Sequence, residues 1–268
     1  MKTNSLAFCV ASLVALLAGL SGCGGGDGDE GGAGGTGGGI IMIPPLTNLV
    51  NLQPGASNTV VALFSRPFMG EYRILNYFDH DRPIHPDDTN GYQVTWRGAR
   101  VVPGQDISGY DGHLGIDWLL PENTPVFAVT GGEVVFAGVE TLPCTLQDNE
   151  IVNQLTARFK FVAPNGDTYT AGYVHLNRVD VAVGNTVTEG QQLGLSGVTG
   201  CVGKAHTPHL HLVLRRYLTL DPPVSYVVDP YGWEGPGVDP WSAQGPGRVS
   251  VWFWKPGQAP DMVPMSPR

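Results

Sequence analysis

The heptapeptide at residues 209–215 is His209-Leu210-His211-Leu212-Val213-Leu214-Arg215. Leucine alternates with other residues along it, and successive side chains of a β-strand point to opposite faces of a sheet. The pattern therefore predicts a strand with the leucines on one face and His209, His211, Val213 and Arg215 on the other. Side chains two residues apart on such a face lie about 6–7 Å from one another, so both histidines can serve one site.

Short apolar runs continue on the amino-terminal side of this strand. They are rich in β-branched, aromatic and aliphatic residues and end in turn signals such as Gly131-Gly132 and Pro164-Asn165-Gly166-Asp167. No stretch shows a sustained helical period with caps. We therefore expect an all-β fold, a mostly antiparallel sheet or barrel-sandwich with few short helices, whose strands include residues 93–96, 126–130, 133–137, 158–163, 168–174, 192–195 and 210–214.

Two segments of the chain resemble each other. Residues 123–138 and residues 184–197 each contain an extended run, a glycine turn and an aliphatic strand that ends in glycine. The similarity predicts a weak internal repeat within the all-β region.

Composition excludes some function classes. The chain has 268 residues, of which 42% are hydrophobic, so it is long enough to bury a core in one or two domains. Its net charge of −9 argues against a nucleic-acid partner, because binding phosphate backbones requires a basic surface.

The amino-terminal end has the pattern of a processing signal. Lys2 precedes an apolar stretch at residues 6–20, and Leu20-Ser21-Gly22-Cys23 follows it. These residues resemble a bacterial lipoprotein signal with its lipobox, which implies cleavage before Cys23, acylation of Cys23 and membrane anchoring of an exported protein, at the outer membrane or in the periplasm if the source is Gram-negative. The alternative is an ordinary secretory signal or a short anchor. Residues 24–39 contain 11 glycines and predict a flexible tether.

Two cysteines remain for the exported part of the chain. Cys9 lies in the predicted signal and Cys23 is assigned to lipid, which leaves Cys144 and Cys201. Disulfides are permitted outside the cytoplasm, so we expect these two to be bonded, with two free buried thiols as the alternative.

Three short motifs carry candidate chemistry: Gly112-His113-Leu114-Gly115-Ile116-Asp117, Tyr173-Val174-His175-Leu176 and His209-Leu210-His211. Two glycines make a helix unfavourable in the first motif, so His113 and Asp117 must converge through a turn into a strand. Two histidines and one aspartate form a three-ligand site with an open position, as in catalytic zinc centres, and the two further histidines suit proton transfer. Any one of these histidines alone would more often be a surface residue or a satisfied core residue.

Together the three motifs resemble the LytM/lysostaphin-type zinc metallopeptidases, which cut peptide bonds in bacterial peptidoglycan. The resemblance implies that His113, Asp117 and His211 bind one Zn²⁺ and that His175 and His209 are the catalytic pair. It also implies a duplicated-hybrid-motif barrel, which the internal repeat matches. The expected partners are peptidoglycan peptides and, through the lipid anchor, a membrane.

On this basis we expect five segments. They are a lipoprotein signal peptide at residues 1–22, a lipidated cysteine and tether at 23–39, an amino-terminal arm and β extension at 40–105, the metallopeptidase core at 106–217, and an extension rich in proline, glycine and aromatic residues at 218–268. The aromatic residues of the last segment are expected to pack on the barrel, with sugar-binding platforms as the alternative.

Other interpretations remain open. The first is a wall-binding or activator module that keeps the fold without turnover. The second is a non-haem iron oxygenase, whose ligand types fit but which leaves the spare histidines and the export signal unexplained. His206 is a further candidate near the metal, with a solvated loop position as the alternative. His80 and His85 are candidate ligands of a second cation, although such clusters usually mark ordinary turns.

Overall fold

The computed structural model describes residues 58–81, 93–101, 112–144, 147, 149–202, 206–218 and 224–260. The predicted signal, Cys23, the tether and His85 lie outside the described residues.

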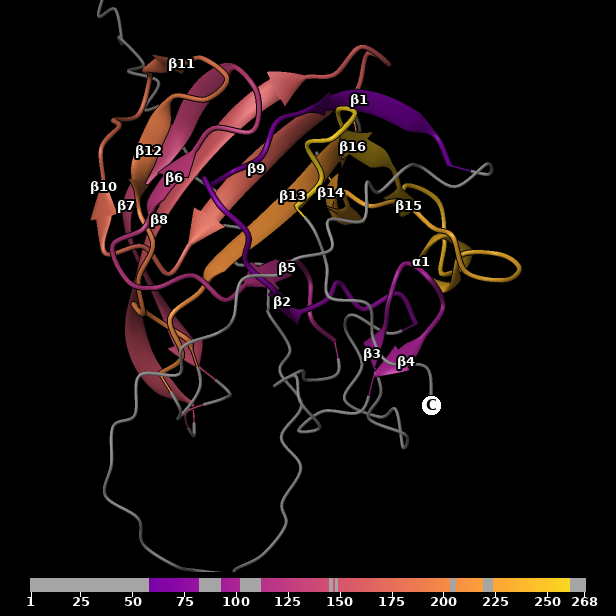
Figure 1. Ribbon diagram of the computed structural model, residues 1–268, viewed down its shortest axis with the longest axis horizontal. Helices are drawn as coiled ribbons and strands as arrows, with labels where there is room; N and C mark the ends of the chain where they lie inside the picture. Colours follow the sequence, from indigo (N-terminus) through magenta and orange to yellow (C-terminus); the bar gives the residue numbers. More distant parts are fainter. Residues whose placement is uncertain are drawn as a thin grey trace, which may run out of the picture.

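A nine-stranded sheet forms the centre of the molecule (Figure 1). Its principal path runs in the order β11-β7-β8-β9-β13-β14-β15, with β5 paired to both β13 and β2. The bounds are β2 Ile74–Asn76, β5 Ile116–Trp118, β7 Gly132–Cys144, β8 Glu150–Val162, β9 Thr168–Val174, β11 Thr186–Val187, β13 Leu210–Leu218, β14 Val224–Asp229 and β15 Val249–Ser250.

Three smaller sheets and one short helix complete the described fold. The first small sheet contains β6 Pro125–Phe127, β10 Arg178–Val179 and β12 Gln192–Leu195. The second pairs β3 Gln93–Val94 with β4 Arg100–Val101, and the third pairs β1 Val60–Phe64 with β16 Trp252–Trp254. The helix is α1 Pro240–Ala243. The β1–β16 and β14–β15 pairs are parallel and the other strand pairs are antiparallel. The all-β, mostly antiparallel prediction is confirmed.

The two similar segments interlock. The first contributes β6 and β7, and the second contributes β11 and β12. Strand β6 pairs with β12, and β7 pairs with β11, so the first strand of each segment pairs with the second strand of the other. The sequence similarity therefore corresponds to a duplicated strand arrangement.

Strand β13 separates the core from an open face. Leu210, Leu212 and Leu214 are buried, whereas His211, Val213 and Arg215 are half-buried on the opposite side. This is the alternation that the heptapeptide predicts. The leucines join a core cluster that extends in sequence from Phe64 to Ala259, so the core is continuous across the expected segment boundaries at residues 106 and 217.

The carboxyl-terminal aromatic residues pack into this core. Strand β16 lies beside β1 (Figure 1), and Trp252, Phe253 and Trp254 are buried. The ring of Phe253 stacks on Phe64 with centroids 4.7 Å apart. Burying large aromatic rings contributes strongly to stability, and residues buried in this way are not available as sugar platforms.

A buried ion cluster holds the amino-terminal arm against the carboxyl-terminal segment. The imidazole of His80 is fully buried, with Nε2 2.8 Å from Asp229 Oδ2 and Nδ1 2.9 Å from Asp239 Oδ1. The ring also lies against Trp233, at a centroid distance of 4.9 Å. Both ring nitrogens are occupied, so His80 is a structural residue and the idea that it binds a second cation is wrong.

A disulfide joins Cys144, the last residue of β7, to Cys201. Their Cα atoms lie 5.1 Å apart, across a sequence separation of 57 residues. The bond fixes the far end of the β7–β8 hairpin to the loop that leads to His209.

The His80 cluster predicts a pH-dependent stability. Burial by itself lowers the pKa of His80, but the hydrogen bonds and charges of Asp229 and Asp239 outweigh burial and raise the pKa from 6.5 to about 9. A group whose pKa is raised on folding stabilises the fold fully below its unfolded pKa and loses that effect as the pH rises through its folded pKa. We expect the free energy of unfolding to fall by about 3 kcal/mol between pH 6.5 and 9.5 through this residue.

Denaturant titrations of the wild-type protein and of His80→Gln at both pH values measure this contribution. The pH dependence that remains in the variant comes from the other titrating groups, so the difference between the two proteins gives the contribution of His80. An equal pH dependence in the two proteins would show that the His80 proton does not stabilise the fold.

Candidate metal centre

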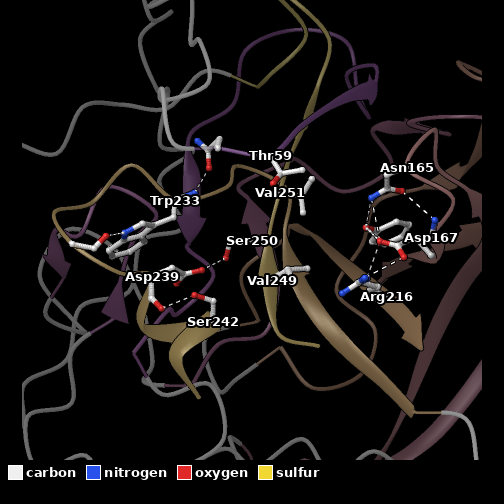
Figure 2. Close-up of a pocket in the computed structure, with 13 residues that line it drawn as sticks. Thr59, Asn165, Asp167, Arg216, Trp233, Asp239, Ser242, Val249, Ser250 and Val251 are labelled. Carbon is white, nitrogen blue, oxygen red and sulfur yellow. Dashed lines mark hydrogen bonds and ion pairs between the residues drawn. The ribbon is translucent and has the colours of Figure 1, made fainter. Parts of the chain in front are cut away.

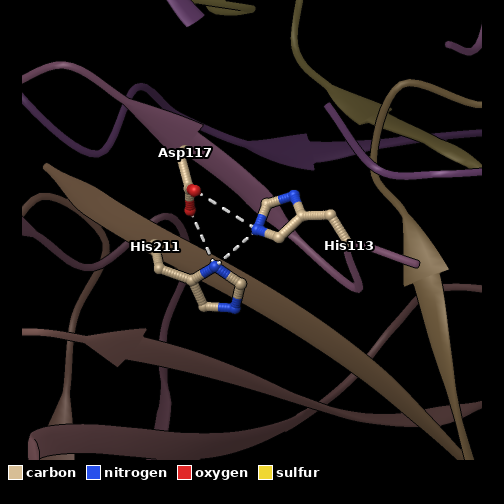
Figure 3. A group of neighbouring side chains, drawn as sticks. All are labelled: His113, Asp117 and His211. Carbon is tan, nitrogen blue, oxygen red and sulfur yellow. Dashed lines mark hydrogen bonds and ion pairs between the residues drawn. The ribbon is translucent and has the colours of Figure 1, made fainter. Parts of the chain in front are cut away.

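Strand pairing brings Asp117 and His211 together. Antiparallel β5 and β13 place the two residues directly opposite each other in the register. Side chains at opposed positions project from the same face of a sheet. His211 Nδ1 lies 2.7 Å from Asp117 Oδ1, as Figure 3 shows.

His113 enters the same group from the turn before β5. Gly112 has φ +83°, which favours glycine, and allows the chain to turn there. The Nδ1 of His113 donates a hydrogen bond to the backbone carbonyl of Tyr77 at 2.7 Å. This bond fixes the tautomer and leaves Nε2 as a lone-pair donor, 3.1 Å from His211 Nδ1 and 3.3 Å from Asp117 Oδ2 (Figure 3).

Gly115 leaves room for the His211 ring. A Cβ atom built at this position would lie 2.6 Å from His211 Cε1 and 2.7 Å from the backbone oxygen of Leu212. Any side chain would displace the imidazole or the strand. The sequence motif contains this glycine, but its contact with the ring is visible only in the structure.

Asn76 orients the carboxylate and was missed by the sequence analysis. It lies on β2, opposite Asp117, and its Nδ2 donates a buried hydrogen bond to Asp117 Oδ2 at 2.6 Å. Groups that hydrogen-bond metal ligands fix their orientation. A single asparagine in a short strand carries no pattern by which sequence reasoning finds it.

The two remaining histidines of the predicted site face the same centre. His175 follows β9 with φ +64°, and its Nδ1 donates to the carbonyl of Thr199 at 2.8 Å. His209 Nδ1 donates to the carbonyl of Thr207 at 2.7 Å. Both rings therefore keep Nε2 as a proton acceptor.

The distances show that these rings lie beside the carboxylate group. The ring centroids of His175 and His209 are 4.7 Å apart, and those of His175 and His211 are 5.8 Å apart. His209 Nε2 is 3.9 Å from Asp117 Oδ2. All five sequence-predicted side chains thus come together.

One carboxylate dominates the electrostatics of the centre. Burial alone raises the pKa of Asp117, but the charges of His113, His209 and His211 lower it well below its usual range. Burial lowers the pKa of His175, and the charges of His209 and His211 lower it further, to well below the usual value. Burial likewise lowers the pKa of His211, while Asp117 opposes the effect. Burial also lowers the pKa of His113, but the charge and hydrogen bond of Asp117 outweigh burial and raise that pKa above its usual value. The centre therefore favours an ionised carboxylate, with His175 and His211 biased toward the neutral form.

This donor set fits a divalent cation. One ligand atom each from His113, Asp117 and His211 lies within 4.8 Å of the others. Two imidazole nitrogens and one carboxylate oxygen match three protein ligands of a catalytic zinc site and leave an open coordination position. A cation here would also balance the buried negative charge.

Two other features of the described structure, the loop residue His206 and a surface cavity, do not offer a comparable group of metal ligands. His206 is exposed on its loop. A cavity of about 430 Å³ opens beside β15 and α1 (Figure 2). Its charged side chains are already paired, Arg216 with Asp167 at 2.9 Å and Asp239 with Ser250 at 2.7 Å.

Comparison with known proteins gives the following matches. The sequence profile of Peptidase family M23 matches residues 111–222. Peptidoglycan DD-endopeptidase ShyA of Vibrio cholerae is 32% identical over 148 residues, which are 55% of this chain and 26% of that protein. Glycyl-glycine endopeptidase ALE-1 of Staphylococcus capitis is 33% identical over 99 residues, which are 37% of this chain and 23% of that protein. The chain thus spans about a quarter of the length of these relatives.

Among solved structures, a zinc-containing peptidase from Vibrio cholerae is 28% identical, with 61% of this chain and 39% of that chain covered and a TM-score of 0.36. The all-β assignment rests on the strand pairings described above.

We expect alanine substitutions at the five side chains of the centre to fall into two groups according to their effect on zinc content. Replacing His113, Asp117 or His211 by alanine removes one of three ligand atoms and should lower zinc occupancy sharply. His175→Ala and His209→Ala should keep one zinc per chain, because the expected ligand set does not include either ring. Elemental analysis of the five purified variants, with exposed His206→Ala as control, measures this. Full zinc in all three ligand variants would contradict the ligand set.

Proposed function

We propose that this chain, whose residues 111–222 match the sequence profile of Peptidase family M23, is a zinc-dependent endopeptidase that hydrolyses peptide bonds in bacterial peptidoglycan. The observation that carries the proposal is the convergence of His113, Asp117 and His211 with the free Nε2 atoms of His175 and His209. Three ligands alone would suit several metal functions. Two further imidazoles at the open side suit a reaction that moves protons.

The substrate class follows from the relatives. One is named for a DD-endopeptidase activity on peptidoglycan and the other for cleavage at glycyl-glycine bonds. Both names contain the word endopeptidase. We therefore assign the peptide part of peptidoglycan to this chain as substrate.

Zinc held by His113, Asp117 and His211 would lower the pKa of a water molecule toward about 7 and polarise the scissile carbonyl. The chain itself supplies the proton transfers. The Nε2 of one spare imidazole accepts the proton of the attacking water, and the other ring, in its protonated form, donates an Nε2–H to the oxyanion. The carbon–nitrogen bond breaks when the leaving amine receives a proton from the imidazole that holds it. The hydrogen bonds from His175 and His209 to backbone carbonyls keep both Nε2 atoms directed at the centre.

Rival functions differ in measurable ways. A wall-binding or activator module would bind peptidoglycan without releasing fragments. A non-haem iron oxygenase would need iron and would leave His175 and His209 without a task. Zinc content together with loss of turbidity of purified sacculi separates the three functions.

The catalytic pair is tested by substitution. Zinc-loaded His175→Ala and His209→Ala proteins should lose about 10²- to 10⁴-fold in turnover, the usual effect of removing a positioned acid or base. The rate of fragment release from purified sacculi, followed by mass spectrometry, measures the loss. His206→Ala should hydrolyse at the wild-type rate. Near-normal hydrolysis by both zinc-loaded alanine variants would end the proposed roles of this pair.

We also propose that the chain is exported and anchored to a membrane through acylated Cys23. The support is the Leu20-Ser21-Gly22-Cys23 sequence and the glycine-rich residues 24–39. Within the described residues, no helix has the length and apolar character needed to cross a bilayer.

Metabolic labelling tests the anchor. Cells that express the full chain should incorporate a labelled fatty acid into the wild-type protein and not into Cys23→Ala, and the wild-type protein should sediment with membranes. Equal labelling of the two proteins would rule out acylation at this cysteine.

A further inference from the structure

The open face of the central sheet continues beyond the metal centre. His211, Val213 and Arg215 occupy alternate positions of β13 and are half-buried on the side opposite the leucines. Two residues of an extended strand span about 6.7 Å, so the Cα of Arg215 lies about 13 Å from that of His211. Across β9, Gly172 lies opposite Val213, and Thr170 lies opposite Arg215.

Two glycines shape this face, one where neighbouring side chains pack closely and one beside open space. A Cβ atom at Gly172 would lie 3.0 Å from Val213 Cγ1 and 3.5 Å from Arg158 Nε. Arg158 lies opposite Gly172 on β8, and its Nε passes 3.5 Å from that position, while its Nη2 reaches Glu140 on β7. On β7, a Cβ at Gly138 would meet no atom within 4 Å, which means that it points into open space.

The two arginines of this face differ in their partners. Arg158 Nη2 is 3.0 Å from Glu140 Oε1 and lies over the ring of Phe136 at 5.5 Å. Arg215 has no hydrogen bond or ion pair to any other residue in the described ranges. Burial, followed by the charge of Arg158, lowers the pKa of Arg215, while Tyr217 and the charge of Glu140 oppose the shift without reversing it. The guanidinium is therefore partly desolvated beside a like charge.

A desolvated cation without an acceptor is costly, because buried charges need paired partners. The planar guanidinium fork matches the two oxygens of a carboxylate. Beyond the metal centre, the described face carries the cations of Arg158, Lys160 and Arg215. The carboxylates of Glu140 and Glu133 pair with Arg158 and Lys160, which leaves an excess of one positive charge for a ligand.

We propose that Arg215, with Arg158 beside it, binds a free carboxylate of the peptide substrate. This inference rests on the proposed function and names a chemical feature that the substrate must carry. An extended peptide advances about 3.3 Å per residue, so the carboxylate lies within about four residues of the bond that is cleaved.

The test uses one peptide in two forms. Cross-linked stem peptide released from peptidoglycan is prepared with its carboxylates free and with the same groups converted to amides. Calorimetric titration into zinc-loaded full-length His175→Ala protein measures affinity without loss of the peptide. We expect the free acid to bind about 10- to 100-fold more tightly than the amide. In the double variant His175→Ala/Arg215→Gln, the free acid should bind more weakly while the amide binds as before, so the two affinities should become equal.

Matched variants separate charge recognition from folding. Arg215→Lys keeps the charge without the fork and should retain part of the preference. Arg178→Gln removes an exposed arginine on β10 that is paired with Asp180 and should leave the ratio unchanged. Arg215→Gln should unfold at no lower temperature than the parent protein, because it removes one of two neighbouring positive charges.

Two outcomes overturn the inference. One is equal binding of acid and amide by the parent protein, and the other is an unchanged ratio in Arg215→Gln. Hydrolysis is measured separately, as the kcat/KM of the wild-type protein, in which His175 is intact, for each of the two peptides. If that protein cleaves neither peptide, the proposed function fails, while the binding ratio still decides the role of Arg215.

Discussion

The buried carboxylate of Asp117 is the charge around which this molecule is arranged. It lies opposite His211 in the register of β5 and β13, 3.3 Å from His113 Nε2, and accepts a hydrogen bond from Asn76. A buried ionised group is tolerated only where partners compensate it. Three separate parts of the chain supply those partners, so the sheet, the amino-terminal arm and the turn before β5 must fold together for the centre to exist.

Rigidity around this charge comes from long-range connections. The Cys144–Cys201 disulfide fixes the loop that leads to His209, and the carbonyl of Thr199 in the same loop orients His175. On the other side, the buried His80 cluster holds the arm that carries Asn76 against the carboxyl-terminal segment. Preorganised side chains of this kind are what a hydrolytic site needs, because its groups must already be in place when charge develops in the transition state.

The sequence could predict those parts of the site that follow local periodicity. Alternation placed His209 and His211 on one strand face, and glycines at residues 112 and 115 required a turn between His113 and Asp117. The rest depends on contacts without a local signature. Asp229 and Asp239 lie 149 and 159 residues from His80. The acceptors for His175 and His209 are backbone carbonyls, which every residue type has. Parallel pairing of β1 with β16 joins the two ends of the core, and no sequence period marks such a pair.

The central claim is that Asp117, His113 and His211 hold one zinc and leave it open to a solvent ligand. Zinc K-edge X-ray absorption of the loaded protein measures the coordination shell directly. The account predicts two imidazole nitrogens at about 2.0–2.1 Å and oxygen ligands at about 2.0–2.2 Å, with scattering from two histidine rings. A shell with four imidazoles, or with sulfur at about 2.3 Å, would contradict it.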